Sequence, residues 1–358
     1  MKKILIIAPS SIYGGGEVYV KNLINYINKN YIIIVGACNE RLINEINNNV
    51  NFIFKVKPST SQANKLYNNL LINYYSFKYN VDIIFLNGLP ESALYAFTLL
   101  KKNIVCIGHS NESHLRYIND QHGLKNFLLK ILFKLSFKKL KLFIAINEQA
   151  KSNLLYFFPK YKKSQVIYNG VPEMVIEKKK NNDFTVGRIC RLLPDKNVKL
   201  AIDSMKKINK ASLIIAGEGP EKNKLEEHAN RSKIDVTFLG HCNAADFFSK
   251  IDVMLLTTPS NSDGDATPLV ILESMSAGIP VISTKVGGVP ELIEHMVTGI
   301  LCEDTPESFS NAINLLLHDE MLYQTISHNS RNAYIERFSS KITFEQTLSE
   351  INKHTSNN

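Results

Sequence analysis

The sequence predicts an α/β protein with two doubly wound domains. Along its 358 residues, short runs of β-branched and apolar residues alternate with longer segments of helical period. Many of these runs are almost continuously apolar, which is typical of parallel strands covered on both faces. Strands that alternate with helices form right-handed βαβ units, and a chain of this length is too long for one ordinary core. We therefore expect two parallel sheets, each lying between layers of helices.

The predicted strands fall in both halves of the chain. In the first half they are Lys3–Ala8, Ile32–Ala37, Phe52–Val56, Asp82–Leu86, Ile104–Ile107, Leu142–Ile146 and Gln165–Tyr168. In the second half they are Thr185–Ile189, Ser212–Ala216, Asp235–Leu239, Val253–Leu256, Val281–Ser283 and Gly299–Cys302. The last fifty residues read as helices with no strand.

A polar and charged segment at 172–183 separates the two halves. It has no apolar period beyond three residues, so we expect it to be the inter-domain linker. The N-terminal domain is then 1–171 and the C-terminal domain 184–358. We expect the last helix to return to the N-terminal domain.

The bulk composition favours a cytoplasmic protein. The apolar run that follows Met1-Lys2-Lys3 is too short for a signal peptide, and no run approaches the ~20 apolar residues that span a bilayer. The five cysteines are scattered and include no Cys-x-x-Cys pair, so we expect neither a metal site nor a disulfide framework. Buried thiols in a reducing compartment are expected instead.

The charge is unevenly divided along the chain. Residues 1–180 hold 25 Lys+Arg against 10 Asp+Glu (+15), and residues 181–358 hold 17 against 23 (−6), which sum to +9. A one-sided basic half favours an anionic surface as partner, either lipid headgroups or nucleic acid. No nucleic-acid-binding module and no aromatic–basic interleaving is found, so we expect no nucleic-acid partner. A Lys- and Asn-rich composition bias is the alternative, although it would not make the second half acidic.

The segment 122–139 predicts a basic amphipathic helix. Such a helix either packs its apolar stripe on the N-terminal sheet or lies in a membrane interface, where anionic lipid attracts each basic residue by about 1 kcal/mol. The stripe consists of Leu124, Phe127, Leu128, Ile131, Leu132 and Leu135, and the lysines are Lys125, Lys130, Lys134, Lys138 and Lys139.

Two carboxylates in the second half give the strongest indication of function. Asp265 lies in a loop, and Glu273 follows on a helix after seven intervening residues. This spacing suits a nucleotide-sugar donor, because an ionised carboxylate can accept hydrogen bonds from two adjacent ribose hydroxyls. The alternative for Glu273 is an exposed helix position paired with a lysine, for which its apolar neighbours leave little room.

The helix that carries Glu273 has recognisable ends. Thr267 fits its N-cap and Pro268 its first residue, whereas Gly278 closes it and Pro280 stops it. The first turn therefore offers free backbone N–H groups and a partial positive charge, where a diphosphate fits.

Two cations and a glycine run complete the candidate site. Arg188 ends a strand and Lys196 opens the next helix, so a loop can bring them together as a pyrophosphate clamp that stabilises a departing nucleoside diphosphate. Taken alone, such residues are more often solvated surface. Gly14-Gly15-Gly16 follows the first strand and lets backbone N–H groups approach a phosphate or a sugar.

Further motifs accompany the residues of this candidate nucleotide-sugar site. They are Gly187-Arg188 with Lys196-Asn197, Ala216-Gly217-Glu218-Gly219-Pro220, Gly287-Gly288-Val289-Pro290-Glu291, Tyr168-Asn169-Gly170-Val171 and Gly14-Gly15-Gly16-Glu17. Together with Asp265-x₇-Glu273 they resemble family 4 of the retaining GT-B glycosyltransferases. The resemblance covers most of the chain and is strongest over 165–305. It implies a GT-B fold, in which two Rossmann-like domains face each other across a cleft.

The resemblance also implies a role for each matched residue. Arg188 and Lys196 would bind the donor diphosphate, Glu273 the ribose, and Asp265 hydroxyls of the transferred sugar. Further donor contacts would come from Gly15, Gly16, Thr267, Pro268, Leu269 and Val270. His109, in Gly108-His109-Ser110, would lie near the transferred sugar; the alternative is a histidine at the edge of the core, satisfied by backbone.

The activity implied is a metal-independent, α-forming hexosyl or N-acetylhexosaminyl transfer from a nucleoside-diphosphate sugar, UDP-linked by preference. No cofactor and no covalent nucleophile are expected, because retention would come from front-face attack. The acceptor would be a lipid-linked sugar or a growing bacterial surface polysaccharide, handled by a peripheral protein at the cytoplasmic face of the membrane. A GT-B sugar-nucleotide epimerase and a non-catalytic glycosyltransferase-like subunit are the alternatives.

Two details of the acidic segment depart from the pattern. The first acid of this family is usually Glu, and the shorter Asp265 bears on donor-sugar preference. Asp263-Gly264-Asp265 also spells Asp-x-Asp, a metal–nucleotide motif of another glycosyltransferase fold. Its surroundings are those of a helix-opening loop, so we expect no metal there.

Overall fold

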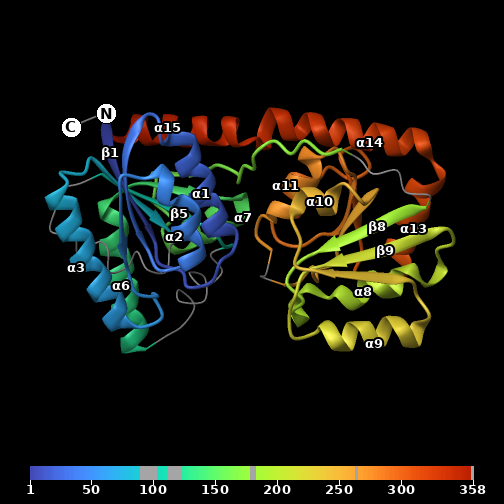
Figure 1. Ribbon diagram of the computed structural model, residues 1–358. Coiled ribbons are helices and arrows are strands. Elements are labelled where there is room, and N and C mark those ends of the chain that lie inside the picture. Colours follow the sequence, from blue (N-terminus) through green and yellow to red (C-terminus); the bar gives the residue numbers. More distant parts are fainter. Residues whose placement is uncertain (89–102, 112–122, 178–182, 263–264, 356–358) are drawn as a thin grey trace. The chain divides into compact units, whose positions relative to one another are not determined.

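The computed structural model describes residues 1–88, 103–111, 123–177, 183–262 and 265–355 (Figure 1). The chain forms two compact units. Unit 1 comprises Met1–Gly170 and Ser340–Asn358, and unit 2 comprises Val171–Ser339. Each of the predicted strands overlaps an observed strand, so the fold class of two parallel-sheet domains is confirmed.

Unit 1 is built on a parallel sheet. In its described part the strand order is β3-β2-β1-β4-β5-β6-β7, with parallel pairing throughout. The strands are β1 (Lys2–Ala8), β2 (Tyr31–Ala37), β3 (Phe52–Lys55), β4 (Ile83–Asn87), β5 (Asn103–Gly108), β6 (Leu140–Ala145) and β7 (Ser164–Val166). The helices are α1 (Gly15–Ile27), α2 (Glu40–Ile46), α3 (Gln62–Lys78), α6 (Leu124–Lys139), α7 (Glu148–Phe157) and α15 (Ser340–Thr355), with a 3₁₀ turn at Asn47–Asn49.

Unit 2 repeats the plan with a smaller sheet. In its described part the order is β10-β9-β8-β11-β12-β13, again parallel. The strands are β8 (Phe184–Ile189), β9 (Ala211–Ala216), β10 (Val236–Gly240), β11 (Val253–Leu256), β12 (Val281–Thr284) and β13 (Ile300–Cys302). The α-helices are α8 (Val198–Ser204), α9 (Lys222–Ser232), α10 (Ala244–Phe248), α11 (Leu269–Ser276), α12 (Val289–Leu292), α13 (Pro306–His318) and α14 (Glu320–Ala333). Shorter 3₁₀ turns at Pro194–Lys196 and Met205–Lys207 and a π turn at Tyr334–Phe338 complete it.

The strand order of each unit changes direction at one place. In unit 1 the chain winds outward from β1 to β3 and then returns to place β4 on the other side of β1. In unit 2 the same switch lies between β8 and β11. Ligands of doubly wound sheets bind beyond the carboxyl ends of the strands at such a switch. The residues after β1, β4, β8 and β11 are therefore where a site is expected.

The C-terminal helix α15 belongs to unit 1, where it lies beside α1 (Figure 1). Phe344 of α15 is fully buried, and its ring meets the ring of Tyr19 at 5.4 Å. A Cβ at Gly170 would lie 1.9 Å from the hydroxyl oxygen of Thr343. Only glycine at position 170 therefore allows α15 to pack this closely.

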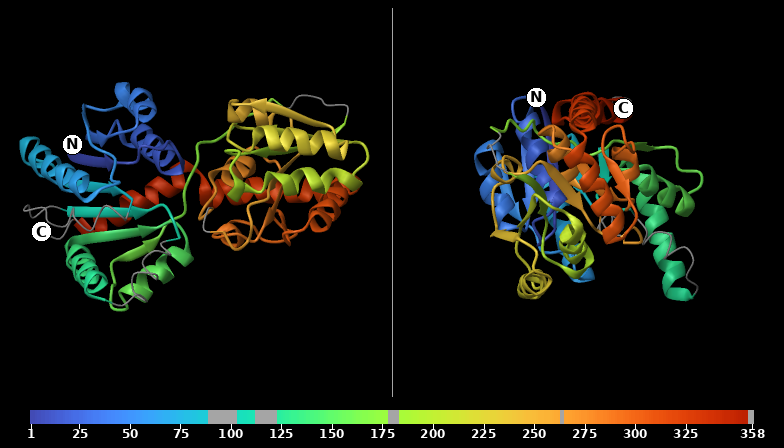
Figure 2. Two further views of the ribbon diagram at one scale, coloured as in Figure 1. Left: turned by 90° about the horizontal axis from the view of Figure 1, so that it is seen from below. Right: turned by 90° about the vertical axis from the view of Figure 1, so that its right-hand side faces the viewer.

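Helix α6, for whose apolar stripe two alternatives were open, exposes the described part of that stripe. In the right-hand view of Figure 2 it projects from the edge of unit 1. Phe127, Ile131 and Leu135 are 59%, 39% and 46% exposed, whereas Phe137, among the described side chains of this helix, is buried in the core. The side chains of Leu124, Leu128 and Leu132 lie outside the described part of the structure.

All five cysteines are free thiols. Cys106 and Cys302 are buried as expected, whereas Cys38, Cys190 and Cys242 are partly exposed. Among the described helices, none is both long enough and apolar enough to cross a bilayer.

Candidate functional site

Arg188 is a buried cation at the carboxyl end of β8. Its side chain is 1% exposed. One terminal nitrogen, Nη2, reaches the carbonyl of Lys196 at 3.5 Å, while Nε is buried without a hydrogen-bond partner. Within the described ranges, no carboxylate lies at ion-pair distance from this guanidinium. Burying an uncompensated charge costs on the order of several kcal/mol, so the position is built to meet an anion.

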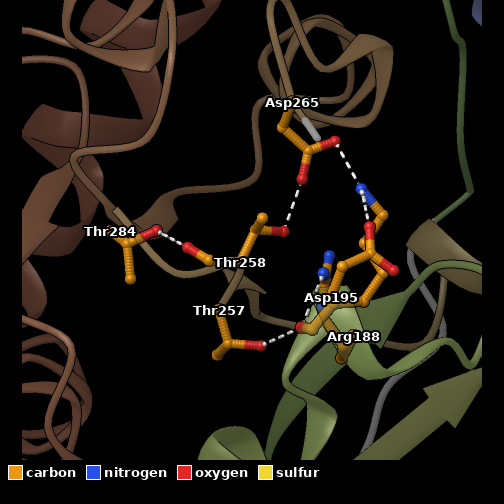
Figure 3. A network of polar contacts seen from close by, with 7 residues as sticks. Arg188, Asp195, Thr257, Thr258, Asp265 and Thr284 are labelled. Carbon is orange, nitrogen blue, oxygen red and sulfur yellow. Dashed lines mark hydrogen bonds and ion pairs between the residues drawn. The ribbon is translucent and has the colours of Figure 1, made fainter. Parts of the chain in front are cut away.

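Lys196 is held beside Arg188 by a network of polar contacts. Figure 3 shows this network with Arg188, Asp195, Thr257, Thr258, Asp265 and Thr284 labelled. Its Nζ lies 2.9 Å from Asp265 Oδ1 and 3.6 Å from Asp195 Oδ2. The other carboxylate oxygen of Asp265 accepts a hydrogen bond from the hydroxyl of Thr258. The carbonyl of Lys196 accepts a hydrogen bond from Thr257 Oγ1 at 3.1 Å. Asp265 and Lys196, predicted from distant parts of the sequence, are thus direct partners.

Thr257 and Thr258 follow β11, the strand across the switch from β8. Both side chains are fully buried, and the hydroxyl of Thr284 donates to the Thr258 carbonyl. Neither threonine belongs to a sequence motif of the candidate site. The available signal was their place directly after a buried strand, where polar residues at the carboxyl edge commonly serve a ligand.

Two glycines position the loop that carries Lys196. Gly217 has φ +125°, and a Cβ there would lie 1.8 Å from the carbonyl oxygen of Cys190. A Cβ at Gly219 would lie 2.3 Å from the carbonyl oxygen of Leu192. The backbone N–H of Leu192 in turn donates to the carbonyl of Glu218 at 2.9 Å. The segment 216–220 therefore supports the 190–197 loop through direct backbone contact.

Helix α11 begins one residue later than predicted. Pro268 has ψ 116°, which is extended, so it is the N-cap, and the helix starts at Leu269 rather than at Pro268 with Thr267 as cap. The other end is as expected, because Gly278 has φ +68° just past the last turn and Pro280 follows. The first-turn amides of Leu269 and Val270 have no intrahelical carbonyl to bond and form an anion-binding helix end.

Glu273 lies in the second turn of α11. Its side chain is half-buried, and burial raises the pKa of its carboxyl group. In the described part of the chain its carboxyl group makes no hydrogen bond and no ion pair, so the alternative of a lysine-paired surface position is not observed. A half-buried carboxyl group without a protein partner is free to accept hydroxyl donors.

In unit 1, the glycine loop lies against His109 and Asn87. A Cβ at Gly16 would lie 3.3 Å from the His109 ring and 3.4 Å from Asn87 Nδ2. Asn87 Nδ2 donates to the carbonyl of Gly16 at 3.3 Å, and Asn87 Oδ1 lies 2.6 Å from His109 Nε2. Gly14 N–H donates to Glu17 Oε2 at 3.0 Å, which begins α1. The loop after β1, the end of β4 and the residue after β5 thus meet at the carboxyl edge of the sheet.

These contacts settle the protonation of His109. A carbonyl oxygen can only accept, so Asn87 turns its amide nitrogen to Gly16 and its oxygen to His109. Nε2 of His109 must then carry the proton, which leaves Nδ1 as an acceptor. Burial lowers the pKa of His109 to about 4, so the ring is neutral at physiological pH. The alternative prediction, a histidine satisfied by backbone, is wrong because its partner is the Asn87 side chain.

Asn87 likewise belongs to no sequence motif of the candidate site. It ends β4 next to β1, directly after four buried apolar residues. A polar side chain at that place, on the carboxyl edge and at the switch, was the signal.

No metal-binding arrangement occurs among the described residues. Nowhere in the described ranges do three His, Cys, Asp or Glu side chains gather around a common point in a way that could hold a cation. Asp263 and Gly264 of the Asp-x-Asp sequence lie outside the described residues.

Comparisons with known proteins cover most of the chain. The family profile described as Glycosyltransferase Family 4 matches residues 13–173, and the one described as Glycosyl transferases group 1 matches residues 172–333. The N-acetyl-alpha-D-glucosaminyl L-malate synthase of Bacillus anthracis is 39% identical over 136 residues, which are 37% of this chain and 34% of that protein. The capsular polysaccharide biosynthesis glycosyltransferase CapM of Staphylococcus aureus is 26% identical over 48% of this chain and 47% of CapM. The chain thus matches about a third to a half of the length of these curated relatives.

Solved structures are similar over the whole fold. Anabaena HepE, crystallised with UDP and glucose, superposes with a TM-score of 0.80 at 20% identity, covering 99% of this chain and all of HepE. The lipopolysaccharide outer core galactosyltransferase WaaB superposes with a TM-score of 0.74 at 18% identity, covering 99% of each chain.

Proposed function

The chain belongs to glycosyltransferase family 4, and on this premise we propose that it transfers a hexose or an N-acetylhexosamine from a UDP-linked donor with retention of the α configuration. The relatives support the class of reaction. One is named for an N-acetyl-alpha-D-glucosaminyl product and another for capsular polysaccharide biosynthesis. A neighbour in fold was crystallised with UDP and glucose.

One observation carries the proposal: the buried guanidinium of Arg188, which has no carboxylate partner among the described residues. A diphosphate would supply the missing negative charge, with Lys196 as the second cation. Both cations would stabilise the charge that develops on the leaving nucleoside diphosphate, and this needs no metal ion. The first-turn amides of Leu269 and Val270 would add hydrogen bonds to the same group.

The two acids would take the sugars at either end of the diphosphate. Glu273, which has no protein partner in the described structure, would accept hydrogen bonds from the ribose hydroxyls. Asp265 would contact hydroxyls of the transferred sugar while it continues to orient Lys196. Its carboxylate has one oxygen on Lys196 and the other on Thr258, so it is fixed before the donor arrives.

In unit 1, His109 would serve the transferred sugar as a hydrogen-bond acceptor. Its Nδ1 carries no proton in the tautomer that Asn87 imposes, and it makes no hydrogen bond within the described ranges. A neutral ring with a pKa of about 4 neither repels nor attracts the diphosphate strongly. Gly15 and Gly16 would bring backbone N–H groups to the donor.

The acceptor is proposed to be a lipid-linked sugar or a growing surface polysaccharide at the cytoplasmic membrane. The support is the net +15 of residues 1–180, which favours an anionic surface. The capsular and lipopolysaccharide names among the relatives point to the same class of acceptor.

The test is incubation of the full chain with a panel of UDP- and GDP-sugars, with nucleotide release and thermal shift as readouts. The proposal expects one UDP-sugar to stabilise the protein and release UDP when an acceptor is added. A β-linked product from an α-linked donor would contradict retention. Conversion of a nucleotide sugar without any acceptor would favour the epimerase alternative instead.

A further inference from the structure

A cavity of about 680 Å³ opens beside α6 in unit 1. It lies between the C-terminal half of α6, the end of α7 and the segment 158–163 that leads into β7. Volumes of this size are typical of small-molecule sites. None of its lining residues belongs to the proposed donor site.

The cavity is at the opposite edge of the sheet from the glycine loop and His109. Helix α6 ends directly before β6 begins, and the 158–163 segment directly precedes β7. Because the sheet is parallel, the cavity lies at the amino ends of its strands. Gly16, Asn87 and His109 follow carboxyl ends, so this is a separate site.

Five lysines surround the cavity. All five are exposed, and within the described ranges none of them forms an ion pair. Among the described residues that line the cavity, none is acidic. Like charges that converge on one opening repel one another, and an anion bound between them relieves this repulsion. They are Lys134, Lys138, Lys160, Lys162 and Lys163.

The floor of the cavity is aromatic. Phe137 and Phe157 are buried, and the ring of Phe158 lies 4.5 Å from each of them. Tyr161 meets Phe137 edge-on at 5.5 Å. Because these rings pack against one another, they form an apolar surface that suits an alkyl chain. They are less suited to stacking with nucleic-acid bases.

The outer face of α6 continues this surface. Phe127, Ile131 and Leu135 recur every fourth residue and are exposed. Lys134 and Lys138 flank this row on the same helix. An exposed apolar row with basic flanks is the pattern of a helix that lies in the interface of an anionic membrane.

We propose that this cavity binds the phosphate headgroup of an anionic membrane lipid, with the first part of the acyl chains against the aromatic floor. The exposed row of α6 then lies among the neighbouring lipids. This inference rests on the proposed function in that it names the lipid contact of a membrane-facing transferase, but it concerns a site that takes no part in the transfer.

The test uses the full chain and vesicles of phosphatidylcholine, alone or in an equimolar mixture with phosphatidylglycerol. Sedimentation with the mixed vesicles is compared for the wild type, for the triple variant Lys160→Gln/Lys162→Gln/Lys163→Gln, and for a control. The control, Lys206→Gln/Lys207→Gln/Lys210→Gln, removes the same charge from exposed positions in unit 2. Each basic residue near an anionic surface contributes about a fivefold gain in affinity, so the first variant should bind roughly 100-fold more weakly and the control should bind like the wild type.

A second arm separates a lipid from free phosphate. Dihexanoyl phosphatidylglycerol, below its micelle concentration, should raise the unfolding temperature of the wild type but not of the triple variant, and glycerol phosphate should have no effect. Equal stabilisation by glycerol phosphate would overturn the lipid assignment. So would sedimentation that is the same for wild type and triple variant, or an equal loss in the control. Binding of single-stranded RNA that the triple variant loses, without any response to lipid, would also overturn it.

The two proposals fail separately. The triple variant should keep the thermal shift that UDP induces, because none of its substituted residues belongs to the candidate donor site. Lys196→Ala should lose that shift and still sediment with mixed vesicles.

Discussion

Lys196 Nζ and Asp265 Oδ1 are 2.9 Å apart, although 69 positions separate the two residues in the chain. The pair joins the loop after β8 to the loop before α11 across the switch point of unit 2. Both side chains are largely buried, at 11% and 16% exposure. The phosphate-binding cation and the sugar-binding acid of the proposed site are therefore one electrostatic unit.

Substitutions of Asp265 and of Lys196 should differ in how they change the affinity for UDP and the turnover of the UDP-sugar. Asp265→Asn keeps an oxygen acceptor but removes the charge, and UDP carries no transferred sugar. We expect UDP affinity to stay within a fewfold of the wild type, while the UDP-sugar turnover falls by about 10- to 100-fold, the effect of one hydrogen bond to a charged group. Lys196→Ala should weaken both. Calorimetry with UDP and steady-state rates separate the two patterns.

Lys207→Ala is the matched control for this comparison. Lys207 is exposed in unit 2 and lies outside the candidate site, so both readouts should remain at wild-type values. If Asp265→Asn weakened UDP as strongly as the UDP-sugar, Asp265 would not be a sugar contact.

Arg188→Met should abolish UDP binding without lowering the stability of the ligand-free protein. Methionine has a similar length and no charge, so it removes a buried guanidinium that has no carboxylate partner in the described structure. We expect the ligand-free protein to be unchanged or stabilised by up to about 4 kcal/mol, as when other buried charges are replaced by apolar groups. The UDP-induced thermal shift should disappear.

Arg191→Met tests the same chemistry at an exposed position three residues further along. It should alter neither the unfolding temperature nor the UDP response. A marked destabilisation by Arg188→Met would show that the guanidinium is satisfied within the protein, and the diphosphate assignment would lose its main support.

Much of the fold could be predicted from the sequence because parallel strands that are covered on both faces consist of nearly continuous apolar residues. β1, β2 and β8 are examples, and their boundaries were found within one or two residues. The start of α11 was predicted one residue early, because proline suits both an N-cap and a first helical position and only ψ decides between them.

The sequence could nominate residues for the candidate site but not the contacts that they make. Motif spacing singled out Lys196 and Asp265, yet their ion pair depends on how two loops meet beyond a sheet. The contacts of Thr258 in unit 2 and of Asn87 in unit 1 likewise depend on how loops pack, which local sequence does not encode. Helix α6 shows a different limit, since an amphipathic stripe suits a buried face and an interfacial face equally well, and the sequence alone does not reveal that Phe127, Ile131 and Leu135 are exposed.

The neutral state of His109 predicts a pH dependence of stability. Its pKa is lowered from 6.5 to about 4 in the folded protein, so the unfolded chain binds the proton first as pH falls. The contribution of neutral His109 to the free energy of unfolding is therefore fully present above pH 6.5. It decreases between pH 6.5 and about 4, and changes no further below that. The loss attributable to this residue is at most about 3 kcal/mol. Urea unfolding of wild type and His109→Gln across this range should show a flatter profile for the variant, and parallel profiles would contradict the assignment.

Gly170→Ala should destabilise unit 1, because its Cβ would lie 1.9 Å from the hydroxyl oxygen of Thr343 and α15 would have to shift. We expect a loss of about 1–3 kcal/mol, as for other overpacked positions. Thr343→Ala removes the clashing oxygen, so the double variant should recover part of the loss relative to Gly170→Ala alone, measured by urea unfolding. Gly14→Ala is the control, since its nearest neighbour would be 3.8 Å away. Two outcomes would contradict this reason: unfolding of Gly170→Ala like the wild type, or no recovery with Thr343→Ala. Either would show that the packing of Thr343 against position 170 does not require glycine there.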